Sequence, residues 1–298
     1  ADGLQQMGPV QFGAEAPRVY KGAVIQTDVT FNKVGYHYPQ QRIITLWEDV
    51  APTLAKTRAP EPFVIRMNTF DCTQFMHTNL VPKDYQLDDY QVKTPTDIIG
   101  QHIHLPKWDL TTADGAANGW NYEDGTLSPE MVVSRIKAIN AFNAEPGNAA
   151  VLTDVEGNPV VNSAGQSIGK ALKPLPHPFF GAGPQDTYLG ARTTLQRWFA
   201  DPVVNTDGVD RGLGVIFTHD HYGPSTHQQI GLYATVLTEP AGSTWVHNET
   251  GAPMYTRADG GPTSWQAAIL TGDTDGDGAD DSFREFYFEY SDFQHAYE

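Results

Sequence analysis

The chain has 298 residues, of which 40% are hydrophobic and 11% aromatic, so it can fold as one large β domain or two ordinary domains with a buried core. Its 36 acidic and 19 basic residues give a formal net charge of −17, which disfavours nucleic acid and anionic membrane surfaces as partners. No apolar run approaches the ~20 residues of a membrane span. The single cysteine, Cys72, excludes an internal disulfide and a cysteine-rich zinc module.

Residues 1–16 are interpreted as an N-terminal extension, after which short apolar segments recur over residues 17–250. They are bounded by Gly, Pro, Asp or Asn, and examples are "GAVIQTDVTF", "RIITLWEDV", "FVIRMNTFDCTQF", "DIIGQHIHL", "GVIFTHDH" and "GLYATVLTEP". Repeated short runs with β-branched and aromatic residues between turn signals predict the strands of a sandwich or barrel. We therefore expect an all-β domain over residues 17–250.

A long insertion, about residues 114–184, interrupts this pattern. Within it, "SPEMVVSRIKAINAF" predicts a helix, because Ser128 can cap it, Pro129 suits its first position and Val132 begins an apolar face. The following "TDVEGNPVVNSAGQSIG" is rich in turn signals and predicts a surface hairpin or loop. Further along, "GARTTLQRWFADP" predicts a short second helix that Pro202 ends.

The last segment, residues 251–298, is interpreted as an Asp/Gly-rich linker and the first strand of a following domain. Phe286, Phe288 and Tyr290 alternate with other residues, as in a strand. Nothing after this strand can pair with it, and an aromatic strand with an open edge is a liability, so we expect a partner outside this chain.

Two His-x-His pairs are the candidate metal ligands. Residues i and i+2 of a strand point to the same face, so His102 and His104 project together, as do His219 and His221. Neutral imidazole binds copper, zinc, iron and nickel, and four rings converge if the two strands face each other. The intervening Asp220 then points to the other face.

His227 follows the second pair and is expected as a fifth ligand, as a group behind the ligands, or as a plain surface residue. The remaining histidines are isolated, and we expect ordinary structural or surface roles for them: His37, His77, His177, His247 and His295.

The stretches "IIGQHIHLPKWDLTTADGAANGWNYEDGT" and "GVIFTHDHYGPSTHQQIGLYATVLTEPAGSTW" resemble the multicopper oxidase family, most of all its large bacterial branch associated with manganese oxidation. The likeness extends over about residues 24–245. It implies a cupredoxin-like Greek-key β-sandwich. It also implies that His102 binds a type 2 copper, and that His104, His219 and His221 bind the type 3 pair.

The resemblance also implies a partner. The family's trinuclear site takes eight histidines from two domains, and this chain offers four, so another cupredoxin domain or chain would complete the site that reduces O2 to water. A reducing substrate, with Mn(II) as one candidate, would supply electrons at the partner's type 1 copper. An extracellular, periplasmic or cell-surface location is implied as well.

The chain departs from the family at the type 1 copper. Asp220 stands where that site's His-Cys-His motif has its cysteine, and a hard carboxylate does not replace a soft thiolate. Cys72 and His77 form a Cys-x4-His pair without a methionine at axial spacing, so Cys72 is expected to be a buried thiol.

"DTDGDGADD" is a second metal candidate. Asp273, Asp275, Asp277 and Asp281 match ligand positions of a calcium loop, but the bidentate Glu expected at its last position is Arg284. A solvated turn between strands is the alternative.

Two other functions stay open. A single-ion enzyme of cupin or three-histidine zinc type would hold one ion in this chain alone; Asp109 and Gly115 loosely imitate a cupin, although Gly100 is wrongly spaced. A non-catalytic cupredoxin scaffold is the other.

Overall fold

The computed structural model describes residues 17–82, 97–116, 124–172, 177, 179–181 and 188–290. The expected N-terminal extension, residues 1–16, and His295 lie outside the described residues. Among the described helices, none has the length and apolar character needed to cross a membrane.

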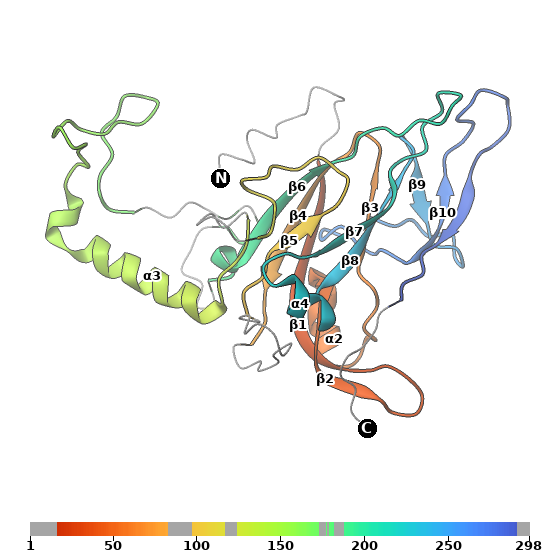
Figure 1. Ribbon diagram of the computed structural model, residues 1–298, viewed down its shortest axis with the longest axis horizontal. Coiled ribbons are helices and arrows are strands. Elements are labelled where there is room, and N and C mark those ends of the chain that lie inside the picture. The colour runs from red at the N-terminus through yellow and green to blue at the C-terminus, as the bar shows by residue number, and fades with distance from the viewer. Residues whose placement is uncertain are drawn as a thin grey trace.

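Two four-stranded sheets form the body of the molecule (Figure 1). The first has the order β2-β1-β4-β6 and consists of β1 (Arg18–Thr30), β2 (His37–Leu46), β4 (Cys72–Asn79) and β6 (Thr193–Phe199). The second has the order β3-β8-β7-β5 and consists of β3 (Val64–Asn68), β5 (Gln101–Ile103), β7 (Gly214–Asp220) and β8 (Tyr233–Glu239). Each sheet combines one parallel pair, β1/β4 or β3/β8, with antiparallel pairs.

One apolar core lies between the two sheets. It joins side chains of both sheets, among them Tyr20, Phe75, Trp198, Ile65, Ile216 and Val236. The core forms because every second residue of each strand faces inward, and the inward side chains of the two sheets interdigitate. The predicted all-β sandwich is confirmed. Short helical turns connect the strands: η1 (Trp47–Asp49), α2 (Val50–Leu54), η2 (Pro146–Ala149), η3 (Leu189–Arg192) and α4 (Pro224–Gln229).

The predicted helix of the insertion is α3 (Pro129–Ala144), which extends away from the sandwich in Figure 1. The Ser128 side chain accepts a hydrogen bond from the Met131 amide, and Val132 is the helix's buried residue. Beyond α3, isolated bridges such as Val151 to Gly169 fold residues 151–169 into an exposed hairpin-like loop, as predicted. In its described part, the insertion thus adds a helix and a loop to the sandwich and no strand of either main sheet.

The predicted second helix is wrong. Residues 193–199 form β6, which pairs antiparallel with β4 from Thr78↔Thr193 to Cys72↔Phe199. Leu195 and Trp198 fit a helical spacing, but the β-branched Thr193 and Thr194 and the edge offered by β4 favour a strand.

A third sheet has the order β11-β10-β9, with β9 (Thr244–Val246), β10 (Gln266–Leu270) and β11 (Phe283–Phe286). β11 pairs antiparallel with β10. The expectation that the terminal strand has no partner in this chain is therefore wrong for the edge of β11 that faces β10. Phe286, Phe288 and Tyr290 are exposed. The division into a domain ending near residue 250 and a following domain stays a prediction.

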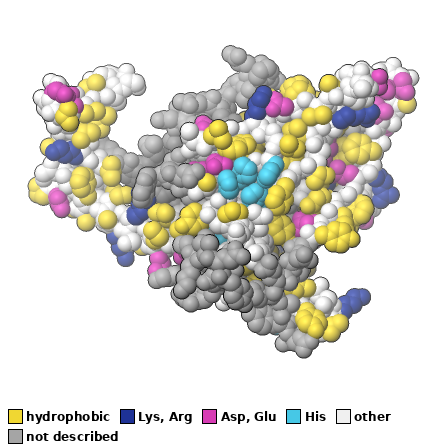
Figure 2. All heavy atoms as spheres, viewed as in Figure 1, with side chains coloured by type: hydrophobic (Ala, Val, Ile, Leu, Met, Phe, Trp, Pro, Cys, Tyr) yellow, Lys and Arg dark blue, Asp and Glu magenta, His cyan; other side chains and the backbone are white. Residues whose placement is uncertain are grey.

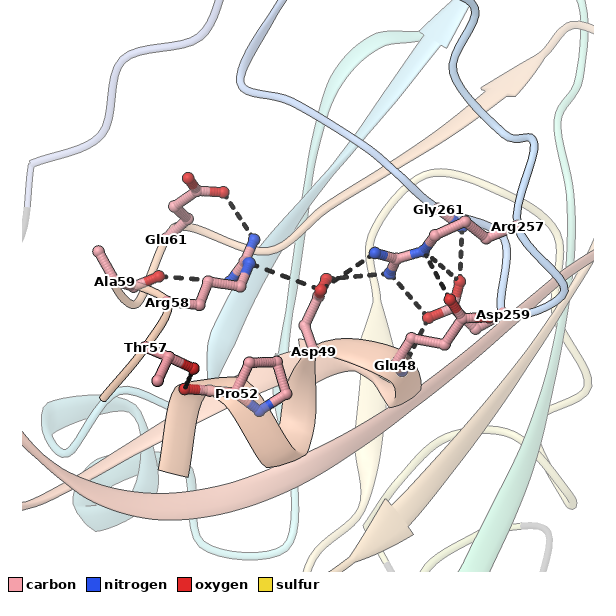
Figure 3. Close-up of polar contacts among 10 residues, drawn as sticks. All are labelled: Glu48, Asp49, Pro52, Thr57, Arg58, Ala59, Glu61, Arg257, Asp259 and Gly261. Carbon is pink, nitrogen blue, oxygen red and sulfur yellow. Dashed lines mark hydrogen bonds and ion pairs between the residues drawn. The ribbon is translucent and has the colours of Figure 1, made fainter. Parts of the chain in front are cut away.

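Residues 253–262 are held to η1, which directly follows β2, by the polar network in Figure 3. The Arg257 guanidinium donates to both carboxylate oxygens of Asp49, at 3.0 and 2.9 Å, and to Asp259. Asp259 in turn accepts the backbone amide of Glu48 at 3.0 Å. The segment that the sequence suggested as a linker therefore packs on the start of the chain.

Candidate metal centre

The pairing of β5 with β7 brings the two His-x-His motifs together. His102 lies directly opposite His219 in the antiparallel register. The ring centroid of His102 lies 5.0 Å from that of His104, 5.3 Å from that of His219 and 4.5 Å from that of His221. The predicted convergence of four imidazoles is therefore present in the structure, and Figure 2 shows histidine side chains gathered on one face.

The ring nitrogens are spaced for a shared ion. The Nε2 atoms of His104 and His219 are 3.1 Å apart, and one ligand atom from each of His102, His104 and His219 lies within 4.8 Å of the others. Imidazole binds zinc at about 2.0–2.1 Å, so two such nitrogens on one ion at square or tetrahedral angles lie about 2.9–3.4 Å apart. The residues present therefore fit a first-row metal ion held by imidazole.

Asp114 orients two of the rings, a role that the sequence analysis missed. Its Oδ1 lies 3.0 Å from Nδ1 of His102 and 3.1 Å from Nδ1 of His221. A second candidate ligand group is formed by the same three residues. Ligating histidines commonly donate their other ring N–H to a carboxylate or carbonyl, which fixes the tautomer. With Nδ1 engaged by Asp114, the Nε2 atoms of both rings are left for a metal.

A tight backbone turn places Asp114. The next residue, Gly115, has a left-handed φ of 81°, and a Cβ there would meet the carbonyl carbon of Gln101 at 2.4 Å. Glycine is required by both the conformation and the close approach. The Asp-Gly pair downstream of the first His-x-His motif was a turn signal, but its contact with the histidines depends on the fold.

Burial favours the neutral, metal-binding form of the rings. The pKa of His102 is lowered by desolvation and by the neighbouring His221, and the pKa of His219 is lowered by desolvation. Nδ1 of His219 also lies 2.7 Å from the Asp220 carbonyl oxygen and 3.0 Å from the Gln228 side-chain amide. Both rings are therefore fixed in orientation and favour the neutral form, which can bind a metal ion.

One side of the cluster is open and has an apolar rim. His104 is exposed, and Leu105 and Val215 beside it are 67% and 63% exposed. Phe217 stacks on His219 with ring centroids 5.0 Å apart, and Trp108 contacts His102 edge-on. The four histidines thus sit at a surface that a further group can reach.

Asp220 and His227 lie behind the cluster. As predicted, Asp220 points away from its two histidine neighbours; it is buried and bonds Nδ1 of the fully buried His227 at 2.7 Å. His227 does not belong to either group of converging ligand atoms among the described residues of the cluster. The expected surface role is wrong, because His227 is fully buried, and its contact with Asp220 places it behind the histidine cluster.

Cys72 and His77 do not form a joint site. They are five residues apart in β4, an odd spacing that sends their side chains to opposite faces. Desolvation raises the pKa of the half-buried Cys72 thiol. The His77 ring is buried against Phe75, with centroids 4.9 Å apart, and its pKa is lowered to about 4 by desolvation.

The Asp-rich loop between β10 and β11 brings three of its four predicted ligands together. Asp273, Asp275 and Asp281 each offer a ligand atom within 4.8 Å of the others, and Asp277 is outside this group. All are exposed, and loop amides already donate to them, for example Gly276 to Asp273 at 2.6 Å. Calcium binding stays a prediction.

No protein-family model and no curated protein sequence matches the chain. Solved structures that resemble it include a copper nitrite reductase from Nitrosomonas europaea (13% identity, TM-score 0.32), a multi-copper oxidase from Pseudomonas thermotolerans (10%, 0.31) and Lac15 from a marine microbial metagenome (11%, 0.32). The matches cover 76%, 76% and 86% of this chain but only 43%, 30% and 42% of those chains. The chain therefore spans less than half the length of each of these structures, and likeness at this level does not identify an activity.

Proposed function

We propose that this chain is a copper-binding domain of a multicopper oxidase, and that its four histidines supply half of a type 2/type 3 trinuclear copper site. The observation that carries the proposal is the convergence of two His-x-His pairs on adjacent strands, with two Nε2 atoms 3.1 Å apart. The family resemblance of the same two stretches assigns His102 to the type 2 copper, and His104, His219 and His221 to the type 3 pair.

The donor set favours copper. Among the described residues, the two converging groups hold four imidazoles, no thiolate and one carboxylate, that of Asp114, which is engaged by two ring nitrogens. Among divalent first-row ions, copper binds such nitrogen sites most tightly. Bound copper would supply the one-electron chemistry by which O2 is reduced to water.

The residues of this chain would hold and orient that chemistry. Asp114 fixes the rings of His102 and His221, and Phe217 and Trp108 shield two sides of the cluster. The exposed His104 and its apolar rim suit the docking of a second cupredoxin domain or chain, which would bring the remaining ligands and the type 1 copper. The whole site would then be protected from water on both sides.

The reductant and the location follow as parts of the same proposal. The net charge of −17 favours a cationic reductant, and Mn(II) is the candidate that the resemblance suggests. An oxidase of this kind would act outside the cytoplasm, at the cell surface, in the periplasm or in the medium.

A single-ion enzyme is the second candidate, because His102, His104 and His219 alone group three ligand atoms within 4.8 Å. Such an enzyme would hold one zinc or iron ion per chain and would need no partner. Metal identity and stoichiometry separate the two functions.

The deciding experiment is elemental analysis of the purified chain after incubation with copper, zinc and iron together. We expect copper to be retained, and to be lost in His102→Ala and in His219→Ala. His247→Ala, which removes a histidine outside the cluster, is the matched control and should retain copper. One zinc or iron ion per wild-type chain, with no copper retained, would reject the copper half-site and favour the single-ion site of His102, His104 and His219.

A further inference from the structure

Asp220 is the only residue between the two histidines of the second motif, and its side chain faces away from them into the protein. It is 2% exposed, so its carboxylate carries a desolvation cost that hydrogen bonds have to offset. Three donors meet it: the Gly100 amide at 2.9 Å, the Gly223 amide at 3.0 Å and Nδ1 of His227 at 2.7 Å.

The Gly100 contact links the two motifs. Gly100 lies just before β5, which carries His102, whereas Asp220 is the last residue of β7. The connection is double, because the His221 amide donates to the Gly100 carbonyl at 2.8 Å while the Gly100 amide donates to Asp220. Gly100, just before β5, is thus bonded to the Asp220 carboxylate and to the backbone amide of His221, two adjacent residues of the second motif.

Gly100 also contacts the turn that carries Asp114. A Cβ on Gly100 would meet the Gly115 carbonyl oxygen at 1.8 Å, so the turn that carries Asp114 rests directly on Gly100. Asp114 in turn bonds His102 and His221. A shift of Gly100 would therefore displace one ligand strand and the carboxylate that orients two rings.

His227 fixes the Asp220 carboxylate from α4. Its ring is fully buried; its amide makes a bond within α4 to the Gly223 carbonyl, and its carbonyl accepts the Leu232 amide just before β8. The neighbouring Gln228 approaches Nδ1 of His219 at 3.0 Å. One short helix therefore touches both Asp220 and a ligand ring.

From these contacts we infer that Asp220, held by His227, is a positioning residue that sets the spacing of the two His-x-His motifs and so the copper affinity of the site. The part of the inference that concerns copper affinity rests on the proposed function. Groups that orient metal ligands from behind typically change metal affinity about 10–100-fold when they are replaced.

Three variants test it. Asp220→Asn keeps the shape but removes one acceptor oxygen; His227→Phe removes the ring donor; His227→Asn keeps an N–H near the position of Nδ1. The matched control is Asp259→Asn, which changes another buried carboxylate that accepts backbone amides, far along the chain in the network of Figure 3.

Two measurements separate this inference from the proposed function. In the metal-free chain, hydrogen exchange of the His221 amide should become at least tenfold faster, relative to amides of β4, in Asp220→Asn and His227→Phe, but not in His227→Asn or Asp259→Asn. In a Cu(II) competition titration, the dissociation constant should rise about 10–100-fold in the first two variants and stay near the wild-type value in the other two.

Wild-type copper affinity together with unchanged His221 exchange in Asp220→Asn would overturn the inference while leaving the copper site standing. A wild-type chain that binds no copper would reject the proposed function, and the exchange experiment would still decide whether Asp220 joins the motifs. If Asp220→Asn does not fold, the two His227 variants are compared instead. Equal copper dissociation constants and equal His221 exchange rates in His227→Phe and His227→Asn would then overturn the inference.

Discussion

At the scale of single residues, His77 shows what burial does to an imidazole that lies outside the metal cluster. Both of its ring nitrogens are buried without a hydrogen-bond partner, and desolvation lowers its pKa to about 4. An unfolded histidine has a pKa near 6.5. The folded chain therefore resists a proton that the unfolded chain accepts, and this contribution to stability is lost as the pH falls from about 6.5 through about 4.

We predict that the wild-type free energy of unfolding falls by about 2 kcal/mol more between pH 7 and pH 5 than that of His77→Phe. The phenyl ring keeps the packing on Phe75 and has no proton to gain. Urea unfolding at the two pH values measures the difference. Equal pH dependence in both proteins would mean that His77 is hydrated or already paired in solution.

At the scale of elements, the sequence predicted what local alternation and spacing control. Strand patterning identified the β-sandwich, the Ser-Pro start identified α3, and the His-x-His spacing identified four converging histidines. β6 was missed because Leu195 and Trp198, three residues apart, fit a helical period, and pairing with the edge of β4 overrides that local preference. Asp114 was missed because the left-handed turn at Gly115 is what folds it back onto His102.

The segment 253–262 makes an element-scale prediction. Arg257→Ala leaves Asp259, which is 2% exposed, without its guanidinium partner, so the free energy of unfolding should fall by about 2–3 kcal/mol. Arg58→Ala is the matched control from the same network: Arg58 pairs with the exposed Glu61 at 2.7 Å and with Asp49 at 3.5 Å, and because Asp49 keeps Arg257, the loss should cost at most about 1 kcal/mol. Urea unfolding of both variants is the measurement. A loss of at most about 1 kcal/mol in Arg257→Ala would contradict the prediction, because it would make this buried ion pair no stronger than one at the surface.

At the scale of the whole molecule, copper should stabilise the sandwich because its four histidine ligands come from β5 and β7 or directly follow them, in the same sheet. A ligand that binds only the folded state at 100 times its dissociation constant adds about 2.7 kcal/mol. We predict a copper-dependent rise in the thermal midpoint that a chelator reverses and that is absent from the double variant of His102→Ala and His219→Ala.

The Asp-rich loop, residues 273–281, supplies the control for the predicted stabilisation by copper. Asp281→Asn alters the exposed loop between β10 and β11 and leaves the histidines intact, so it should keep the full copper effect. A rise that depends on Asp281 would place the stabilising ion in that loop. A rise that persists in the double histidine variant and in Asp281→Asn alike would mean that copper binds elsewhere on this acidic surface, because a formal charge of −17 attracts cations without any defined site.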